Sequence, residues 1–193
     1  KKKHHFDGKI FDYVYNVIIP NLLKKYPFMH LVGNEEAEAD DVIAVITSSL
    51  SIQNNQDTVY IIPNDHDYLQ LLNKVTGIYN LQGKNLLTKA IDGCPYKSLL
   101  LKVLQGDVSD NIKGVLSKVK SVNLLKQCDT LELMDEHFQT KATQQQRDQY
   151  EFNKLMICFD KIPEYIMNNI ISEFHTHTSS NCEACKRICS TSL

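Results

Sequence analysis

Strand and helix patterns alternate through the first half of the chain. Apolar and β-branched residues at 28–33 and 58–63 predict two strands. Each is followed by apolar residues at helical spacing, over 35–50 and 67–73. This alternation is typical of an α/β fold with a parallel sheet flanked by helices.

Other elements of this half are a helix over 10–26, in which Pro20 predicts a kink or break, and a helix over 96–105 that stops at Gly106. Residues 76–87 resemble two short strands joined by a tight turn. Beyond Gly106 the strand patterns vanish, and the spacing of apolar residues predicts a series of helices.

We therefore expect a domain boundary near residue 106. The expected parts are a partial α/β core over 1–106 that opens with a basic segment over 1–30, an all-helical extension over 107–174, and a Cys/His-rich tail over 175–193.

Composition describes an ordinary globular protein: 42% of its 193 residues are hydrophobic and 23% are charged. No apolar run reaches the length of a membrane span and no signal peptide opens the chain, so no membrane partner is expected. Cys94, Cys128 and Cys158 lie singly in apolar or turn contexts. Isolated thiols predict a reducing compartment, cytoplasmic or nuclear, rather than a disulfide framework.

The net charge of −2 conceals a segregated distribution. Residues 1–34 carry six lysines against two acids, and residues 111–128 carry four lysines and no acid. Residues 35–41 read EEAEADD, with five acids in seven positions. Basic flanks around an acidic centre suit a protein that binds phosphates and holds metal ions, although solvated helix faces would explain any single block.

Three acidic clusters, EEAEADD (35–41), NDHD (64–67) and GDVSDN (106–111), lie at strand or helix ends. A parallel sheet gathers such ends on one edge, where ligands bind. Converging carboxylates repel one another unless cations neutralise them, and Mg²⁺ or Mn²⁺ prefers oxygen ligands. Two such ions can activate water and stabilise the leaving oxygen in phosphodiester cleavage. Our candidate metal and catalytic residues are Glu38, Asp40, Asp41, Asp65, Asp67, Asp107 and Asp110.

Simpler structural roles compete with this interpretation. Asn64 or Asp65 would serve as a helix cap, and Glu35 and Glu36 are favoured near a helix N-terminus. On a helix Glu38 and Asp41 share a face, so a ligand pair of Glu38 with Asp40 requires a helix start or an irregular first turn. His66, between the two aspartates, is interpreted as a surface histidine.

The motifs E-A-D-D (38–41), D-x-D (65–67) and G-D-x-S-D-N-I-x-G-V (106–115) together resemble the structure-specific 5′ nuclease family, which includes flap endonucleases and viral and phage 5′-3′ exonucleases. The run N-K-L-M-I-C-F-D-K-I-P (153–163) is similar to the segment that follows this domain in virus-encoded members. The resemblance covers roughly residues 30–165. The third motif is the most specific, because a lone D-x-D is common.

The resemblance implies a PIN-like α/β fold followed by a helix–hairpin–helix-type extension. It also implies hydrolysis of 5′-flap, branched or nicked DNA in replication or repair by two Mg²⁺ ions, for which Mn²⁺ may substitute. The region from Asp110 to about Leu125 would contact duplex phosphates, with a monovalent cation at the hairpin. The residues expected to bind DNA are Lys1, Lys2, Lys3, Lys9, Lys113, Gly114, Lys118 and Lys120.

Two departures from the family pattern matter. Residues 1–30 match neither of the opening strands that carry further metal-binding aspartates in the family, so we expect a fragment or a subunit that needs an N-terminal partner. The hairpin reads GVLSKVKSVN, which keeps Gly114 but loses later glycines. Lys118 and Lys120 would compensate by charge for a less close approach of the backbone to a phosphate.

Three alternatives remain open. The chain would be a non-catalytic DNA-binding part, a small PIN-like ribonuclease, or a metal-binding structural protein. The segment 106–115 argues against the ribonuclease, which has no need of it. The structural alternative relies on the tail, where zinc would use ligands drawn from His175, His177, Cys182, Cys185 and Cys189. A flexible tail with free thiols is the simpler interpretation of that segment.

Overall fold

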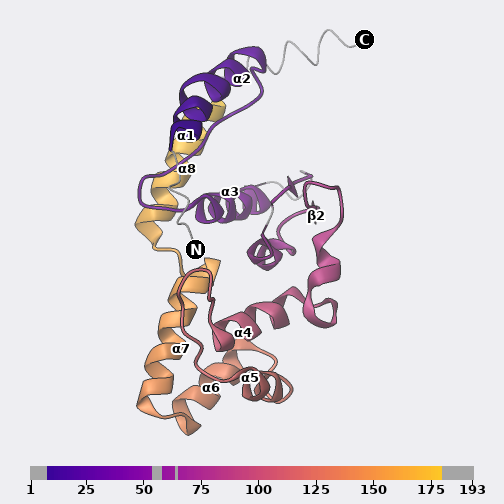
Figure 1. Cartoon of the computed structure of the whole chain (residues 1–193), viewed down its shortest axis with the longest axis vertical. Coiled ribbons are helices and arrows are strands. Elements are labelled where there is room, and N and C mark those ends of the chain that lie inside the picture. Colours follow the sequence, from indigo (N-terminus) through magenta and orange to yellow (C-terminus); the bar gives the residue numbers. More distant parts are fainter. Residues whose placement is uncertain (1–7, 54–57, 64, 180–193) are drawn as a thin grey trace, which may run out of the picture.

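The computed structural model describes residues 8–53, 58–63 and 65–179. As the sequence predicted, the described chain combines many helices with a small parallel sheet. Figure 1 shows α3 and the small sheet in the middle of the molecule, the helices α4 to α7 below them, and α8 rising along one side. No helix in the described ranges is long and apolar enough to cross a membrane.

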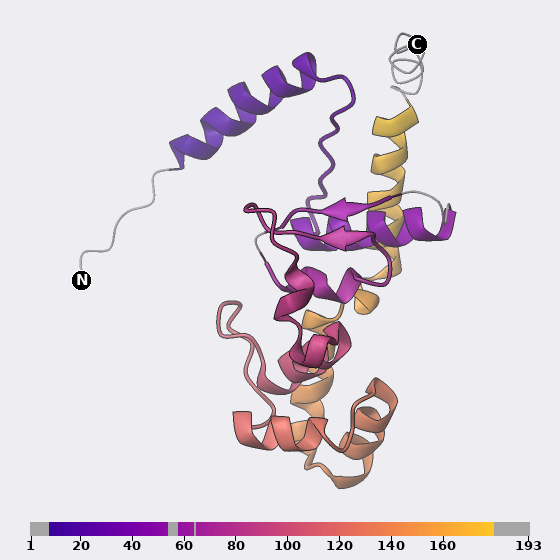
Figure 2. The ribbon, with the colours of Figure 1, turned by 90° about the vertical axis from the view of Figure 1, so that its right-hand side faces the viewer.

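A continuous helix opens the described chain. It consists of α1 (Lys9–Tyr13), a π-helical turn (Val14–Ile18) and α2 (Ile19–Lys25), with right-handed backbone angles at each junction. The kink expected at Pro20 takes the form of this wider turn. Proline has no N–H, and its ring crowds the carbonyl four residues before it, so a π turn gives it room. Figure 2 shows this helix standing away from the rest of the molecule.

The sheet has two parallel strands among the described residues, β1 (Tyr60–Ile61) and β2 (Gly77–Ile78). Tyr60 lies opposite Gly77 and Ile61 opposite Ile78. Ile61 and Ile78 are buried in one cluster with Ala44 of α3 (Ala39–Gln53), so α3 covers the inner face of the sheet. The second acidic cluster follows the carboxyl end of β1 in the sequence.

Several element boundaries differ from the sequence predictions. Residues 28–33 form no strand, and Phe28 and Leu31 are exposed. The helix expected from residue 35 begins at Ala39, and the one expected over 67–73 is a 3₁₀ helix, Asp67–Leu71. In 76–87 the predicted hairpin is reduced to β2 and a single bridge between Tyr79 and Asn85. A strand needs a neighbouring strand to accept and donate its backbone hydrogen bonds, and the described sheet has only two strands.

The C-terminal half of the chain is helical, as predicted beyond residue 106. The structure begins this half earlier, because the helix Pro95–Gln105, which the prediction placed before the boundary, packs with the later helices in one buried cluster. Two 3₁₀ turns (Leu86–Lys89 and Ile91–Gly93) lead into it. Its helices are α4 (Pro95–Gln105), α5 (Lys118–Leu125), α6 (Leu131–Lys141), α7 (Gln144–Ile157), a 3₁₀ turn (Phe159–Lys161) and α8 (Glu164–Ser179). Side-chain caps fix two of the starts: Thr130 accepts from the N–H of Leu133, and Thr143 forms a capping box with Gln146.

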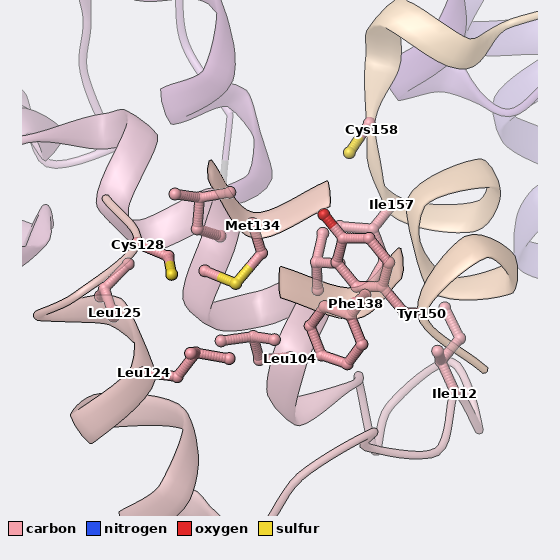
Figure 3. Close-up of a cluster of buried hydrophobic side chains, with 12 residues drawn as sticks. Leu104, Ile112, Leu124, Leu125, Cys128, Met134, Phe138, Tyr150, Ile157 and Cys158 are labelled. Carbon is pink, nitrogen blue, oxygen red and sulfur yellow. The ribbon is translucent and has the colours of Figure 1, made fainter. Parts of the chain in front are cut away.

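The largest buried cluster joins α4, α5, α6 and α7 (Figure 3). Phe138 of α6 and Tyr150 of α7 stack with ring centroids 4.1 Å apart. Leu100, Val103 and Leu104 place one face of α4 in this core. The opposite side of α4 is therefore available to the acidic site.

A buried charge ties α6 to α7. Lys154 is only 6% exposed, and its Nζ lies 2.7 Å from Oδ1 of Asp135 and 2.9 Å from Oε1 of Glu151. The Tyr150 hydroxyl donates a 2.7 Å hydrogen bond to the same Asp135 oxygen. Asp135 therefore satisfies two buried groups at once.

We expect Asp135→Ala to lower the free energy of unfolding by about 2 kcal/mol, because it leaves a buried ammonium and a buried hydroxyl short of a partner while Glu151 still offsets part of the charge. Urea denaturation monitored by circular dichroism measures the change. Glu132→Ala, at a position elsewhere on α6, is the control and should change stability little. Equal losses in both variants would contradict the structural role of Asp135.

Candidate active site

The first acidic cluster forms the start of α3. Glu38 immediately precedes the helix, and its N–H donates to Oδ2 of Asp41 over 3.2 Å. The N–H of Asp41 donates to Oδ1 of Asp40 over 3.0 Å. These three acids therefore surround one helix start, the arrangement that a Glu38/Asp40 ligand pair requires. Burial raises the pKa of Asp41, and the neighbouring charge of Asp40 raises it further although the hydrogen bond from Glu38 opposes both.

The two aspartates of the second cluster have different surroundings. Asp65 is exposed, and its Oδ1 accepts a 3.0 Å hydrogen bond from the N–H of Asp67. This bond closes a turn and is not the predicted helix cap, because the 3₁₀ helix Asp67–Leu71 starts after His66 without a side-chain cap. Asn64, the other capping candidate, lies outside the described residues. The side chain of Asp67 is only 21% exposed and points to α4. Asp65 thus explains the turn, and Asp67 is the residue directed into the site.

Lys102 of α4 joins the second cluster to the third. Its Nζ lies 2.5 Å from Oδ2 of Asp67 and 2.6 Å from Oδ2 of Asp107. The sequence analysis missed Lys102, because a lysine in the last turn of a helix is already favoured by the helix dipole. The signal that could have indicated it is its place beside the buried face of α4, just before the G-D-x-S-D-N motif.

The pKa values of the two partner carboxyls move in opposite directions. Burial raises the pKa of Asp67 and outweighs the hydrogen bond and charge of Lys102. Hydrogen bonds from Lys102 and Ser109 hold the pKa of Asp107 well below its usual range. Burial lowers the pKa of Lys102, but its bonds to Asp107 and Asp67 raise it by more. The ionised form of Asp107 is thus better stabilised than that of Asp67, because Ser109 adds donors that Asp67 lacks.

A tight loop presents the third cluster. Asp107 and Ile112 exchange backbone hydrogen bonds of 3.0 and 2.7 Å, which close the loop. Asn153 is fully buried, and its amide donates to the carbonyls of Val103 and Lys113, so α7 holds both sides of the loop. Asp107 and Asp110 are therefore positioned by backbone bonds rather than by side-chain packing.

Carboxylates from all three clusters approach one cavity of about 630 Å³. Its lining includes Asp67 and Lys102, with apolar residues from the end of α7 and the start of α8 on its other wall. The predicted residues that line it are Glu38, Asp40, Asp41, Asp67 and Asp110. Glu35 and Glu36 line it too, although we expected them only to favour a helix start. Of the remaining candidates, Asp107 reaches the site through Lys102, and Asp65 does not line the cavity.

The donor set fits a hard divalent cation by its chemistry, because the lining carboxylates offer only oxygen and the ammonium of Lys102 already pairs with one of them, Asp67, and with the neighbouring Asp107. The described residues contain no group of three or more His, Cys, Asp or Glu side chains arranged to hold a metal ion. The predicted ligands are thus brought to one cavity but are not gathered into a coordination shell.

The predicted DNA-binding residues fall into three groups. Lys1, Lys2 and Lys3 lie outside the described residues, and Lys9 begins α1. Lys113 and Gly114 are exposed at the end of the third-motif loop, and Lys118 and Lys120 are exposed on α5. The N–H groups of Val115 and Leu116 both donate to the carbonyl of Leu104, so the fold itself uses these two amides. Phosphate binding by the lysines on α5 stays a prediction.

Only two of the five predicted zinc ligands lie among the described residues. His175 and His177 lie on α8, where Nε2 of His177 is 3.8 Å from Oε1 of Glu173. Cys182, Cys185 and Cys189 lie outside the described residues. Zinc binding by the tail stays a prediction.

Comparisons with known proteins relate this chain to 5′ nucleases. No protein-family model matches the chain. Ribonuclease H of Enterobacteria phage T4 is 26% identical over 169 residues, which are 80% of this chain and 54% of that protein. The 5′-3′ exonuclease of Mycoplasmopsis pulmonis (strain UAB CTIP) is 36% identical over 103 residues, 49% of this chain and 34% of that protein. The chain thus spans about half the length, or less, of these curated relatives.

Solved structures of phage T5 proteins share the fold. A mutant of the T5 5′-exonuclease superposes with a TM-score of 0.66 at 17% identity, covering 87% of this chain and 76% of that one. A T5 flap endonuclease in a complex with DNA and metal ions has a TM-score of 0.63 at 14% identity, covering 92% and 73%. The fold is thus that of a 5′ nuclease. Together with the sequence relatives, it confirms the resemblance to the 5′ nuclease family that the motifs indicated.

Proposed function

We propose that this chain is the metal-binding and duplex-binding part of a 5′-3′ exonuclease or flap endonuclease that hydrolyses phosphodiester bonds in branched or 5′-ended DNA. The observation that carries the proposal is the single cavity reached by carboxylates from three separate segments of the chain. The names of the relatives support nuclease chemistry. A role in DNA replication or repair belongs to the proposal as well.

The proposed metal ligands are the seven predicted carboxylates. Two bound Mg²⁺ ions would supply an activated water and would stabilise the leaving oxygen. The chain's own groups would do the rest: Lys102 holds Asp67 and Asp107 together before the ions bind, and Lys113, Lys118 and Lys120 bind backbone phosphates. The metal ions bound in the T5 structures support divalent-ion use.

A second candidate is a DNA-binding part that becomes catalytic only when another polypeptide segment completes the site. Two observations favour it. The described carboxylates form no group of three or more arranged around a metal. Tyr60 of β1 and Ile62, which follows the strand, are 56% and 64% exposed, as expected for a surface that another segment covers.

The test is cleavage of a labelled 5′-flap DNA with Mg²⁺, by the wild type and by Asp65→Asn/Asp67→Asn. We expect the double variant to cleave about a hundredfold more slowly, because it removes charge next to the metal ions while leaving the turn's hydrogen-bond acceptor in place. Asp129→Asn, at an exposed position outside the cavity, is the control and should cleave normally.

Binding separates the two candidates. If the wild type binds the flap in a salt-sensitive manner without cleaving it, the second candidate is correct and the chain requires a completing segment. If it neither cleaves nor binds, both candidates are wrong. Cleavage that survives in Asp65→Asn/Asp67→Asn would exclude this cavity as the site.

A further inference from the structure

Lys102 competes directly with the proposed metal ions for their ligands. It bonds both carboxylate oxygens of Asp67 and also reaches Asp107, and both acids belong to the proposed metal-binding set. The three side chains are 24%, 21% and 14% exposed, so water replaces these contacts poorly. A cation cannot take these oxygens while the ammonium keeps them.

A second lysine on the same helix shows the contrast. Lys97 pairs with Asp92 at 3.0 Å, but the side chain of Asp92 is 70% exposed and the pair lies outside the cavity. An exposed pair of this kind exchanges readily with water and salt. Lys102 differs because it bridges two carboxylates that come from separate segments and would otherwise repel each other.

We propose that Lys102 is the resident counter-ion of this acidic site, and that a divalent cation binds by displacing its ammonium from Asp67 and Asp107. The inference rests on the proposed function, because it concerns the same carboxylates. Without the cation, Lys102 balances part of the negative charge and keeps the two acids together. When the cation binds, it takes over both tasks and releases the ammonium.

The released ammonium acquires a new role. Lys102 lines the same cavity that the proposed substrate must enter, and a DNA phosphate is the anion available to it there. Cation binding would thereby turn an internal ion pair into a phosphate contact. Lys102 is in this view a positioning residue that couples the cation to the DNA.

The first test is calorimetric titration of the full chain with Ca²⁺ alone, for the wild type, Lys102→Met and Lys97→Met. Methionine keeps the length of the side chain but removes its charge. We expect Lys102→Met to bind Ca²⁺ at least about tenfold more tightly, because the cation no longer has to displace an ammonium from a site that is now more negative. Lys97→Met should bind like the wild type.

The same variant should be less stable when no divalent cation is present, and Ca²⁺ should raise its melting temperature more than that of the wild type. Lys102→Gln, which is neutral but polar, gives the same titration if Lys102→Met does not fold. Unchanged or weaker Ca²⁺ binding in the neutral variant would overturn the proposal.

The second test is the salt dependence of binding to a 5′-flap DNA, because each lysine–phosphate contact adds about 0.9 to the slope of log K against log salt. With Ca²⁺, the slope of the wild type should exceed that of Lys102→Met by about this amount. With a chelator the two slopes should agree, since the ammonium then stays on Asp67 and Asp107. A slope difference in the chelator, or none in Ca²⁺, would overturn the exchange.

These measurements fail separately from the proposed function, because neither depends on cleavage. Tighter Ca²⁺ binding by Lys102→Met in a protein that cleaves no DNA would support the exchange and count against the catalytic proposal. Cleavage by the wild type with unchanged Ca²⁺ binding in Lys102→Met would do the reverse.

Discussion

Alanine at Gly106 or Gly114 is expected to destabilise the protein by about 3 kcal/mol or more, because each glycine leaves no room for a Cβ at the point where the third-motif loop closes on α4. A Cβ at Gly114 would lie 2.5 Å from the carbonyl oxygen of Gln105. A Cβ at Gly106 would lie 2.5 Å from the carbonyl carbon of Lys113, and Gly106 also has a φ of +71°, which strains any other residue. The obstacles are backbone atoms, so rotation of a side chain cannot relieve them.

The loss should reach the acidic site as well as the fold, since the same loop carries Asp107 and Asp110. We expect both variants to bind flap DNA more weakly at a temperature where they remain folded. Urea denaturation and DNA titration provide the two measurements. Two glycines serve as controls: Gly83 has a φ of +73° but nothing within 4 Å, and Gly33 has neither obstacle nor positive φ.

The expected order separates strain from collision. Gly33→Ala should be neutral, Gly83→Ala should cost about 1 kcal/mol through backbone strain alone, and Gly114→Ala should cost much more through collision alone. If Gly114→Ala were as mild as Gly33→Ala, the close approach of the loop to α4 would be refuted.

The helical half could be predicted because its information is local. The start of α7 is a capping box between Thr143 and Gln146, three residues apart, and the end of α4 is a glycine with positive φ at residue 106. The apolar spacing of these helices is likewise visible within a few turns. Such features need no knowledge of distant parts of the chain.

The strand expected at 28–33 failed for the opposite reason. Its residues are apolar and suit a strand, but a strand also needs a neighbour, and among the described residues the sheet consists of β1 and β2. The spacing of apolar residues indicates which structure a segment can form, but it does not indicate which segment packs beside it. For the same reason, the exposure of Tyr60 and Ile62 could not be predicted from their apolar residue types.

The sequence predicted which residue types form the site, but it did not predict the contacts between them. The sequence indicated the carboxylates and left open whether Asp65 serves as a cap. In the structure Asp65 accepts a turn bond and does not cap the 3₁₀ helix, and Asp67 contacts Lys102, 35 positions away in the sequence. No local pattern reports such a contact. Lysine in a helix's last turn is common enough that its sequence position alone carries no functional information.

Asparagine at both Asp40 and Asp41 is expected to slow Mg²⁺-dependent cleavage by about a thousandfold while leaving the fold as stable as before, or more so. The activity should fall because two charges that face the cavity are lost, and metal-ion catalysis contributes several kcal/mol to the barrier reduction. Stability should not fall, because burial and the neighbouring Asp40 raise the pKa of Asp41 above its unfolded value, so its ionisation opposes folding. Asparagine also keeps an oxygen that can accept the N–H bonds of the helix start.

The sign of the stability change depends on pH and provides the decisive measurement. A carboxyl whose pKa is raised in the folded state favours folding when it is protonated and opposes it once the pH passes through that pKa. Any gain from asparagine should therefore appear near pH 7, shrink as the pH falls through the raised pKa, and vanish well below the unfolded pKa of about 3.9, where Asp41 is neutral in both states. The control is Glu35→Gln/Glu36→Gln, which removes two acids from the same cavity wall but lies before the helix start. If that pair reduced cleavage as much as Asp40→Asn/Asp41→Asn, total negative charge rather than specific ligands would govern the site.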